Sequence, residues 1–387
     1  MGEYLHKEYG KVEDNMQETK INAKHFIVGP VEIYPEVSKI YDREYTYFRT
    51  SEYSELVQTT LKKLSIFLGN NEENSTIYLA SSGTGAMEAA VENCVEDYDK
   101  CLVINGGTFG HRFCELLKYH DKKYSSVDLA WDEELTYNHL KPYEAKQYTM
   151  LFVNLHETHT GQLYNMQMLS DFCKRNNMLL VVDAISTFLA DEYDMDKYGI
   201  DVTIISSQKG LCLSPGMSLV SFSRRMLEKL QKSELKPSKY FDFKDYLKNI
   251  ERGQTPYTPT VFIMYELQEM LSLIEAKGGK KVWLGYIDSK AKYLRAQLNK
   301  LGFKIPNYPL SNLLTPIILD NVNAYEVIQV LKNKYGLYVN PCGGDLAEKL
   351  IRVSHIGNTT HKDLENLLEK LVLAVEEVKN RGLVNVR

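Results

Sequence analysis

Short apolar runs alternate with helix-forming segments between residues 76 and 223. Five of these runs read TIYLA, CLVIN, TMLFVN, MLLVVD and DVTIIS, and each gives way to polar or small residues. Runs of this length that are rich in Val and Ile are typical of buried strands in a parallel sheet. Alternation of such strands with helices predicts an α/β layer sandwich with a mostly parallel sheet.

The pattern changes near residue 280. It predicts a long helix over residues 282–302, a strand, a helix, two further strands and a last amphipathic helix. We therefore expect a large domain at residues 27–279 and a small C-terminal domain at residues 280–387, built from two helices on a short antiparallel sheet. Residues 1–26 read as an exposed arm, either a disordered tail or a segment that wraps a partner subunit.

Composition narrows the class of protein. The chain has 387 residues, 44% hydrophobic residues and a net charge of -5, which is ordinary for a globular protein and favours neither a nucleic-acid nor a membrane partner. No apolar run approaches the roughly 20 residues that cross a bilayer, and the N-terminal segment lacks an apolar signal core. The six cysteines form no CxxC pair, so we expect reduced thiols in a cytoplasmic protein without disulfides or a zinc site.

Two predicted strands deliver an acid and an amine to the same edge of the sheet. One apolar run ends in Asp183, and the next is followed by Ser-Ser-Gln-Lys, where Lys209 precedes Gly210. Ligand sites of open α/β sheets lie at the carboxyl ends of the strands. A lysine amine can form a Schiff base with an aldehyde, and a carboxylate can keep the ring nitrogen of a pyridoxal phosphate cofactor protonated. Taken alone, each residue would more often be a solvated lysine or a turn residue.

A phosphate site is indicated by Ser82, Gly83 and Thr84, which follow a strand and open a helix. Free N–H groups and the helix dipole favour an anion there, although such residues are usually plain helix caps. The turn is neither a dinucleotide GxGxxG motif nor a Walker loop. Phe109 lies in the turn at the carboxyl end of the next strand, where an aromatic ring can stack on a planar cofactor or simply pack in a loop.

Two further groups carry alternative readings. Arg352 stands among apolar residues in LIRVSHIG, where it suits a substrate carboxylate or an internal salt bridge. His156, Glu157 and His159 could resemble a metal cluster. The two histidines alternate around a strand end, however, so we predict no metal.

The order and spacing of SSGTGAMEAA, HETHTGQLYN, VVDAISTF and SSQKG resemble the class V aminotransferases of fold type I. The similarity covers nearly the whole chain and points to the alanine–glyoxylate and serine–pyruvate aminotransferase group, with 2-aminoethylphosphonate–pyruvate aminotransferases close by. It implies a large domain with a mostly parallel seven-stranded sheet sandwiched by helices, and a small α+β C-terminal domain. It also implies transfer of an amino group from a small amino acid, such as alanine or serine, to glyoxylate or pyruvate.

The resemblance implies roles at the cofactor. Lys209 forms the Schiff base and moves the proton, and Asp183 pairs with the pyridinium nitrogen. The phosphate is held by Ser82, Gly83, Thr84 and Gln208, with Thr258 reaching it from the neighbouring subunit of a homodimer.

The same resemblance places four more residues around the cofactor ring and the substrate. Phe109 stacks on the ring and Ile185 packs on its opposite face. Thr158 contacts the ring's phenolic oxygen, and Arg352 binds the substrate carboxylate.

The chain departs from the family near the substrate mouth. A histidine that often precedes Arg49 is absent there, and the glycine–proline entry reads Gly29-Pro30-Val31-Glu32 in place of GPGP or GPTP. Elsewhere, His159 replaces a small hydroxyl residue. The amino donor therefore stays open, and a phosphonate donor would use extra cations such as Arg49 and Arg112.

Two alternatives lie outside the aminotransferases. A cysteine desulfurase would use Cys342, but such enzymes place a histidine before the lysine, where this chain has Gln208. The other alternative is a non-catalytic protein that keeps the fold.

Overall fold

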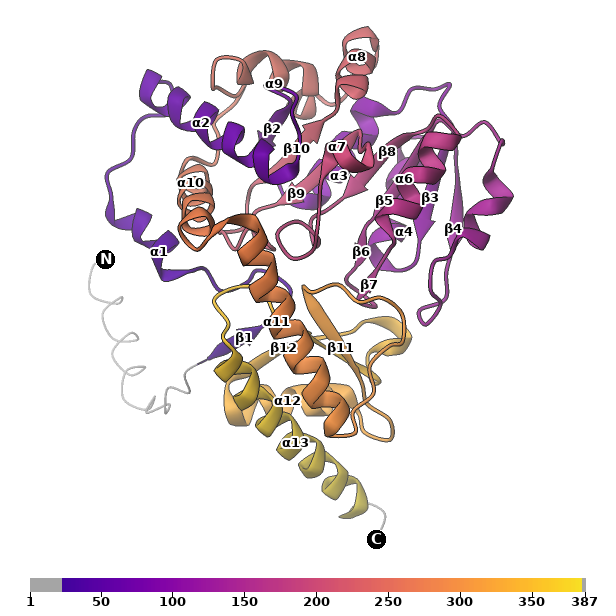
Figure 1. The fold of residues 1–387 in the computed structure, drawn as a ribbon, viewed down its shortest axis with the longest axis vertical. Helices are drawn as coiled ribbons and strands as arrows, with labels where there is room; N and C mark the ends of the chain where they lie inside the picture. The colour runs from indigo at the N-terminus through magenta and orange to yellow at the C-terminus, as the bar shows by residue number, and fades with distance from the viewer. Residues whose placement is uncertain (1–22, 385–387) are drawn as a thin grey trace, which may run out of the picture.

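The computed structural model describes residues 23–384, so most of the predicted N-terminal arm lies outside the described residues. A seven-stranded sheet has the order β2-β10-β9-β8-β5-β3-β4 (Figure 1). Its strands, in chain order, are β2 Thr76–Leu79, β3 Cys101–Asn105, β4 Tyr124–Asp128, β5 Met150–Asn154, β8 Leu179–Asp183, β9 Val202–Ser206 and β10 Ser218–Phe222.

The large sheet is parallel except at one edge. The neighbouring strands from β9 to β4 all run the same way, whereas β10 is antiparallel to both β9 and β2. The strands β2, β5, β9 and β10 are buried along their full length, which is why they read as unbroken apolar runs instead of alternating ones. The predicted α/β fold with a mostly parallel sheet is confirmed.

Helices cover this sheet, with α3 packed against β9 and β10, α4 against β3 and α6 against β8. The helices of this part are α1 Pro35–Ser38, α2 Ser51–Leu68, α3 Gly83–Cys94, α4 Thr108–Tyr119, α5 Tyr137–Leu140, α6 Met166–Arg175, α7 Met195–Tyr198, α8 Arg224–Lys232, α9 Phe243–Ile250 and α10 Val261–Ala276. Helix α2 ends as its sequence predicts, because Gly69 adopts the left-handed conformation at the C-cap.

A second sheet of four strands lies below the first in Figure 1, in the order β1-β12-β13-β11. It consists of β1 Lys24–Phe26, β11 Leu314–Ile318, β12 Leu337–Pro341 and β13 Leu350–Ser354. The helices α11 Gly279–Lys300, α12 Ala324–Tyr335 and α13 His361–Val384 accompany it, and α11 extends up to the larger part (Figure 1). Their apolar side chains form a second core with the sheet.

Strand β1 is a feature that the sequence pattern does not indicate. It pairs in parallel with β12, and its Phe26 is fully buried in the second core. Lys24–Phe26 thus belongs to a sheet whose other strands follow residue 313, although these residues end the segment that we expected to be an arm. Three residues are too short a run to show a strand periodicity.

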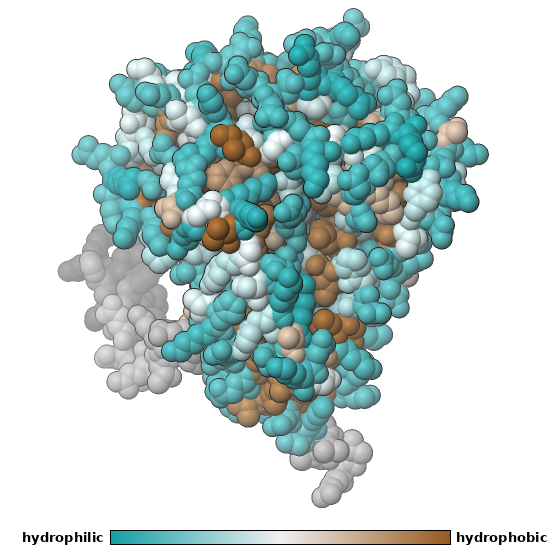
Figure 2. Space-filling model, viewed as in Figure 1, coloured by the Kyte–Doolittle hydropathy of each residue, from teal (hydrophilic) through white to brown (hydrophobic). Residues whose placement is uncertain are grey.

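Figure 2 shows hydrophilic residues over most of the face in view, with hydrophobic residues scattered among them. Within residues 23–384, no helix is long and apolar enough to cross a membrane.

Candidate active site

A pocket of about 590 Å³ opens where loops after the large sheet approach the smaller one. Segments that are far apart in the sequence line it: the start of α4, the turn after β5, the lysine after β9, and the loop between β12 and β13. Its lining residues are Val28, Thr108, Phe109, Trp131, Thr158, His159, Lys209, Gly343, Gly344, Asp345, Leu346 and Arg352. The pocket therefore brings together four residues that the sequence analysis placed at the cofactor or substrate, Phe109, Thr158, Lys209 and Arg352, and also His159.

Asp183 is the last residue of β8, and its carboxyl group is held from two sides. The Asn154 amide donates to Oδ2 at 2.8 Å, and the Ile185 backbone N–H donates to Oδ1 at 2.9 Å. Asn154 ends the adjacent strand β5 and stands in register with Asp183. Burial raises the pKa of Asp183 to about 6, against the opposing effect of these two donors and of Lys209. Asp183 is 1% exposed and forms no ion pair with any described residue, so it is a buried acid that lacks a cation.

Lys209 follows β9, next to β8 in the sheet, so its amine and the Asp183 carboxyl start from the same sheet edge. Burial and the nearby Arg352 lower the pKa of Lys209 to about 8, while Asp183 opposes the shift. The Lys209 side chain passes close to Gly29, where an added Cβ would lie 2.8 Å from Lys209 Cδ. An amine with this pKa is deprotonated far more readily than an exposed lysine, which suits it to nucleophilic and base chemistry.

The helix start that was predicted to hold a phosphate packs against Ile185. Ser82 is the N-cap of α3 and accepts from the Gly85 N–H at 3.3 Å. An added Cβ at Gly83 would lie 2.4 Å from Ile185 Cδ1, so a larger residue there would push on the Ile185 side chain. Arg112 on α4 donates to Thr84 Oγ1 at 3.2 Å, which adds a cation to this helix start.

Gln208 and Thr258 complete the predicted phosphate set. The Gln208 side chain hydrogen-bonds Ser206 at the end of β9. Thr258 lies on an exposed loop before α10 and is not part of the pocket wall. The described chain therefore brings Gln208 close to the sheet edge and leaves Thr258 at the surface.

Arg352 on β13 reaches across to the turn after β5. It donates to the backbone oxygens of Thr158, at 2.7 Å, and of Pro341, while its Nε has no hydrogen-bond partner in the described chain. No carboxylate of residues 23–384 forms an ion pair with it, so the internal salt bridge of the alternative reading is not formed there. Burial lowers the pKa of Arg352, yet a guanidinium stays charged at any ordinary pH.

Strand β6 (His156–Glu157), which follows β5, and the turn after it carry three residues with different partners. His156 Nδ1 faces the Ser186 backbone oxygen at 2.8 Å, and burial lowers the pKa of His156 to about 3. Glu157 is fully buried and accepts backbone N–H groups of α4. His159 lines the pocket, and its ring lies 3.7 Å from Cys342 Sγ. The three side chains therefore have different partners.

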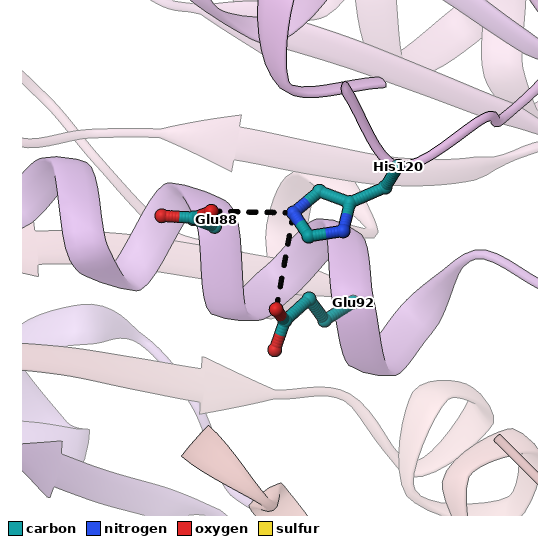
Figure 3. A group of neighbouring side chains, drawn as sticks. All are labelled: Glu88, Glu92 and His120. Atoms are coloured by element: carbon teal, nitrogen blue, oxygen red, sulfur yellow. Dashed lines mark hydrogen bonds and ion pairs between the residues drawn. The ribbon is translucent and has the colours of Figure 1, made fainter. Parts of the chain in front are cut away.

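A different histidine does meet two carboxylates, outside the pocket. His120 Nε2, at the end of α4, lies 3.3 Å from Glu88 Oε1 and 3.8 Å from Glu92 Oε1, both on α3 (Figure 3). All three side chains are partly exposed. The group therefore connects two neighbouring helices, and a protonated imidazole would pair with both acids.

Sequence reasoning missed two side chains that shape this region, Asn154 and Glu157. The available signal for Asn154 is its place at the end of an apolar run, one strand away from Asp183. Glu157 was considered only as a metal ligand. Its signal is a charge directly after a buried strand, which is costly unless hydrogen bonds compensate it.

Comparison with known proteins gives consistent results. The sequence model of the family described as Aminotransferase class-V matches residues 35–367. An uncharacterized aminotransferase of Methanocaldococcus jannaschii is 29% identical over 359 residues, which are 91% of this chain and 92% of that protein. The L-aspartate–glyoxylate aminotransferase of Paracoccus denitrificans is 25% identical over 87% of this chain and 86% of its own length. The crystal structure of an alanine–glyoxylate aminotransferase from Nostoc sp. superposes with a TM-score of 0.84 and 25% identity, over 91% of this chain and 95% of that one.

Proposed function

This chain belongs to the class-V aminotransferase family and is a pyridoxal-phosphate-dependent transaminase, and we propose that it transfers an amino group from a small amino acid to glyoxylate or pyruvate. The observation that carries the proposal is a set of three charged groups around one pocket: the buried Asp183 at the end of β8, and the half-buried Lys209 and Arg352 in the pocket wall. None of them forms an ion pair with a described residue. Unpaired buried charges are costly. An anionic substrate and a cationic ring nitrogen would compensate them.

The residues present fit pyridoxal phosphate. Asp183 is a buried acid that lacks a cation, and the hydroxyl of Thr158 in the pocket wall is buried without a hydrogen-bond partner in the described chain. We propose that Lys209 holds the cofactor covalently and that Asp183 pairs with its ring nitrogen. Phe109, Ile185 and Thr158 would contact its ring.

The phosphate end would rest on the start of α3. Helix α3 spans 12 residues, and its positive end carries the free N–H groups of Ser82, Gly83 and Thr84. Gln208 hydrogen-bonds at the neighbouring strand end, and Arg112 adds a positive charge beside Thr84. This distribution of charge suits a dianionic group.

When bound, this cofactor supplies an electron sink for the charge that develops at the substrate's α-carbon. The residues of the chain move the proton, hold the charge at the sheet edge and bind the substrate. Lys209 takes and returns the proton at Nζ, for which its pKa of about 8 is well placed. Asp183, fixed by Asn154 and Ile185, keeps its negative charge at the sheet edge. Arg352 offers its free Nε–H to the substrate carboxylate and so fixes the α-carbon in the pocket.

The relatives favour glyoxylate as the acceptor, because the names of the Paracoccus enzyme and of an alanine–glyoxylate aminotransferase from Rattus norvegicus both include glyoxylate. A phosphonate donor would need a further cation in the pocket. Of the two candidates, Arg49 donates to the Gln254 side chain and the Thr255 backbone, and Arg112 donates to Thr84. Neither lines the pocket, so we favour alanine or serine over 2-aminoethylphosphonate.

Two other activities receive less support. A desulfurase would need a reactive thiol, but burial raises the pKa of Cys342, and the thiol is directed at the His159 backbone oxygen. A non-catalytic protein would have no use for a lysine with a lowered pKa beside an uncompensated acid.

We also propose a homodimer in which Thr258 reaches the cofactor phosphate of the partner subunit. Its support is a cluster of aromatic side chains at the start of α10, close in sequence to Thr258. Tyr41 stacks on Phe262 with ring centroids 5.4 Å apart, and Tyr45 lies 4.8 Å from the same ring. Tyr41 is 50% and Tyr45 61% exposed. Exposed aromatic groups of this kind are typical of protein interfaces.

Lys209→Ala tests the central assignment. We expect it to abolish transamination of an alanine or serine donor and to remove the visible absorbance of covalently held cofactor. Asp183→Asn serves as the comparison, because it should still bind cofactor while turning over very slowly. A Lys209→Ala protein with the spectrum and rate of the wild type would remove this lysine from the mechanism. A panel of amino acids in a single half-reaction identifies the donor.

A further inference from the structure

Glu157 is a buried acid whose carboxylate is shared between two segments of the pocket wall. It is fully buried, and its Oε2 accepts the backbone N–H groups of Phe109 and Gly110, each at 3.2 Å. Its Oε1 accepts the His159 N–H at 3.1 Å. Both oxygens are therefore used, one by helix α4 and the other by the turn that follows β5.

These two segments carry residues of the cofactor and substrate site. The start of α4 provides Thr108 and Phe109 to the pocket, and the turn provides Thr158 and His159. Helix α4 has no side-chain cap of its own, because its N-cap residue is a glycine. Glu157 supplies the missing acceptor from a distant part of the sequence, at the positive end of the helix dipole.

The packing around this carboxylate leaves little freedom. An added Cβ at Gly107 would lie 2.6 Å from both Cγ and Cδ of Glu157, so the glycine is needed for the side chain to approach the helix. No cation forms an ion pair with Glu157 among the residues that the structure describes. The ionisable groups that interact with Glu157 through their charges are Asp183, Arg352, Cys342, Tyr164 and Tyr308.

We propose that Glu157 is a positioning residue for the bound cofactor: its carboxylate ties the start of α4 to the turn after β5, and so fixes Phe109 and Thr158 relative to each other. This inference rests on the proposed function, which gives both residues a place against the cofactor ring. Glu157 itself touches neither the cofactor nor the substrate. The carboxylate is required because it accepts on both oxygens, whereas an amide has one acceptor and would direct its NH₂ group at a backbone N–H.

The test compares Glu157→Gln with a matched control, Asp201→Asn. Asp201 is also buried, with 1% exposure, and it accepts the Leu180 N–H at 2.9 Å and the Ser223 hydroxyl at 2.7 Å. It precedes β9 and so lies at the opposite end of that strand from Lys209. Pyridoxal phosphate is titrated into each cofactor-free protein, and the visible circular dichroism of the bound cofactor is recorded. We expect Glu157→Gln to weaken binding about tenfold and to reduce the dichroic band, with Asp201→Asn unchanged in both. The melting temperature of each cofactor-free protein is measured alongside.

A Glu157→Gln protein that melts at a lower temperature, yet binds pyridoxal phosphate with the wild-type affinity and dichroic band, would reduce Glu157 to a helix cap and overturn the inference. Gly107→Ala displaces the same carboxylate without removing its charge, and it should also weaken binding. It decides the matter if Glu157→Gln does not fold, since unchanged binding would then reject the inference. Failure of the wild-type protein to bind pyridoxal phosphate would instead reject the proposed function.

Discussion

At the scale of single residues, the site depends on polar side chains that hold charges in a dry place. Asp183 is held by one amide and one backbone N–H, and Arg352 by backbone oxygens. Such neutral partners fix a charged group in position without neutralising it, so its field stays available to a ligand. The proposed chemistry therefore rests on supporting residues as well as on the charged ones.

Asn154→Ala tests whether the proposed chemistry depends on a residue that supports Asp183. The change removes the donor to Oδ2, so the carboxylate becomes less stable and its pKa rises further. A hydrogen bond to a charged group contributes about 1.5–3 kcal/mol, so we expect kcat to fall roughly ten- to hundredfold. Asn70→Ala is the control, since Asn70 is also a buried asparagine, bonded to Ser75 and Ser221. Equal kcat values for the two variants would contradict the supporting role of Asn154.

The pKa of Lys209 sets a second prediction. Only the neutral amine attacks an aldehyde, and burial lowers the pKa of Lys209 to about 8. The rate at which the cofactor-free protein reacts with added pyridoxal phosphate should rise with pH up to about 8 and then level off. Stopped-flow absorbance measures this rate. A rate that keeps rising toward pH 10 would show a lysine with an ordinary pKa.

At the scale of elements, the lysine is presented by a tight contact between two loops. Gly210, directly after Lys209, packs against the backbone of the loop that follows β8: an added Cβ would lie 2.0 Å from the Phe188 oxygen. Backbone atoms cannot move aside as the end of a side chain can. The position of the lysine therefore depends on the absence of a side chain at the next residue.

Gly210→Ala should lower the free energy of unfolding by about 1–3 kcal/mol, the usual cost of overpacking, and should weaken cofactor binding. Denaturant unfolding measures the first effect and a pyridoxal phosphate titration the second. Gly285→Ala on helix α11 is the control, because an added Cβ there meets no atom within 4 Å. Alanine favours a helix over glycine, so this variant should be as stable as the wild type or more so. A stable Gly210→Ala protein with normal binding would contradict the prediction.

At the scale of the whole molecule, the two sheets share the site. The large sheet contributes Lys209 and the small one Arg352, and the pocket lies between them. A substrate that binds both groups would link the two parts. Thr258 stays at the surface of the single chain, which is consistent with a place in the site of a second copy.

Subunit mixing tests the proposed dimer. Lys209→Ala and Thr258→Glu chains should each be inactive alone, because the first lacks the amine of every site and the second places a negative charge against every cofactor phosphate. In a mixed dimer, one site receives both changes and the other receives neither. After unfolding and refolding an equal mixture, we expect about a quarter of the wild-type activity, since half of the dimers are mixed and each has one intact site. A mixture that stays inactive would place Thr258 outside the partner's site.

Local patterns in the sequence determined the main features of this protein. Apolar runs and helical spacing specified the strands of the large sheet and the helices between them, because burial and periodicity are local properties. The same patterns put Asp183 and Lys209 at strand ends and Ser82 at a helix start, where N-cap chemistry needs only a few residues. Motif spacing indicated the family that the comparisons confirm.

Tertiary structure alone decided which distant side chains meet. The register between β5 and β8 sets Asn154 beside Asp183, and the packing of α4 over the turn after β5 brings Glu157 to the helix start. The pairing of β1 with β12 likewise joins residues more than 300 positions apart. Contacts of this kind depend on strand register and on how layers stack, and neither leaves a periodic signal in the residues concerned. The sequence therefore specified the elements and the chemistry at their ends, while packing between the elements decided what supports that chemistry.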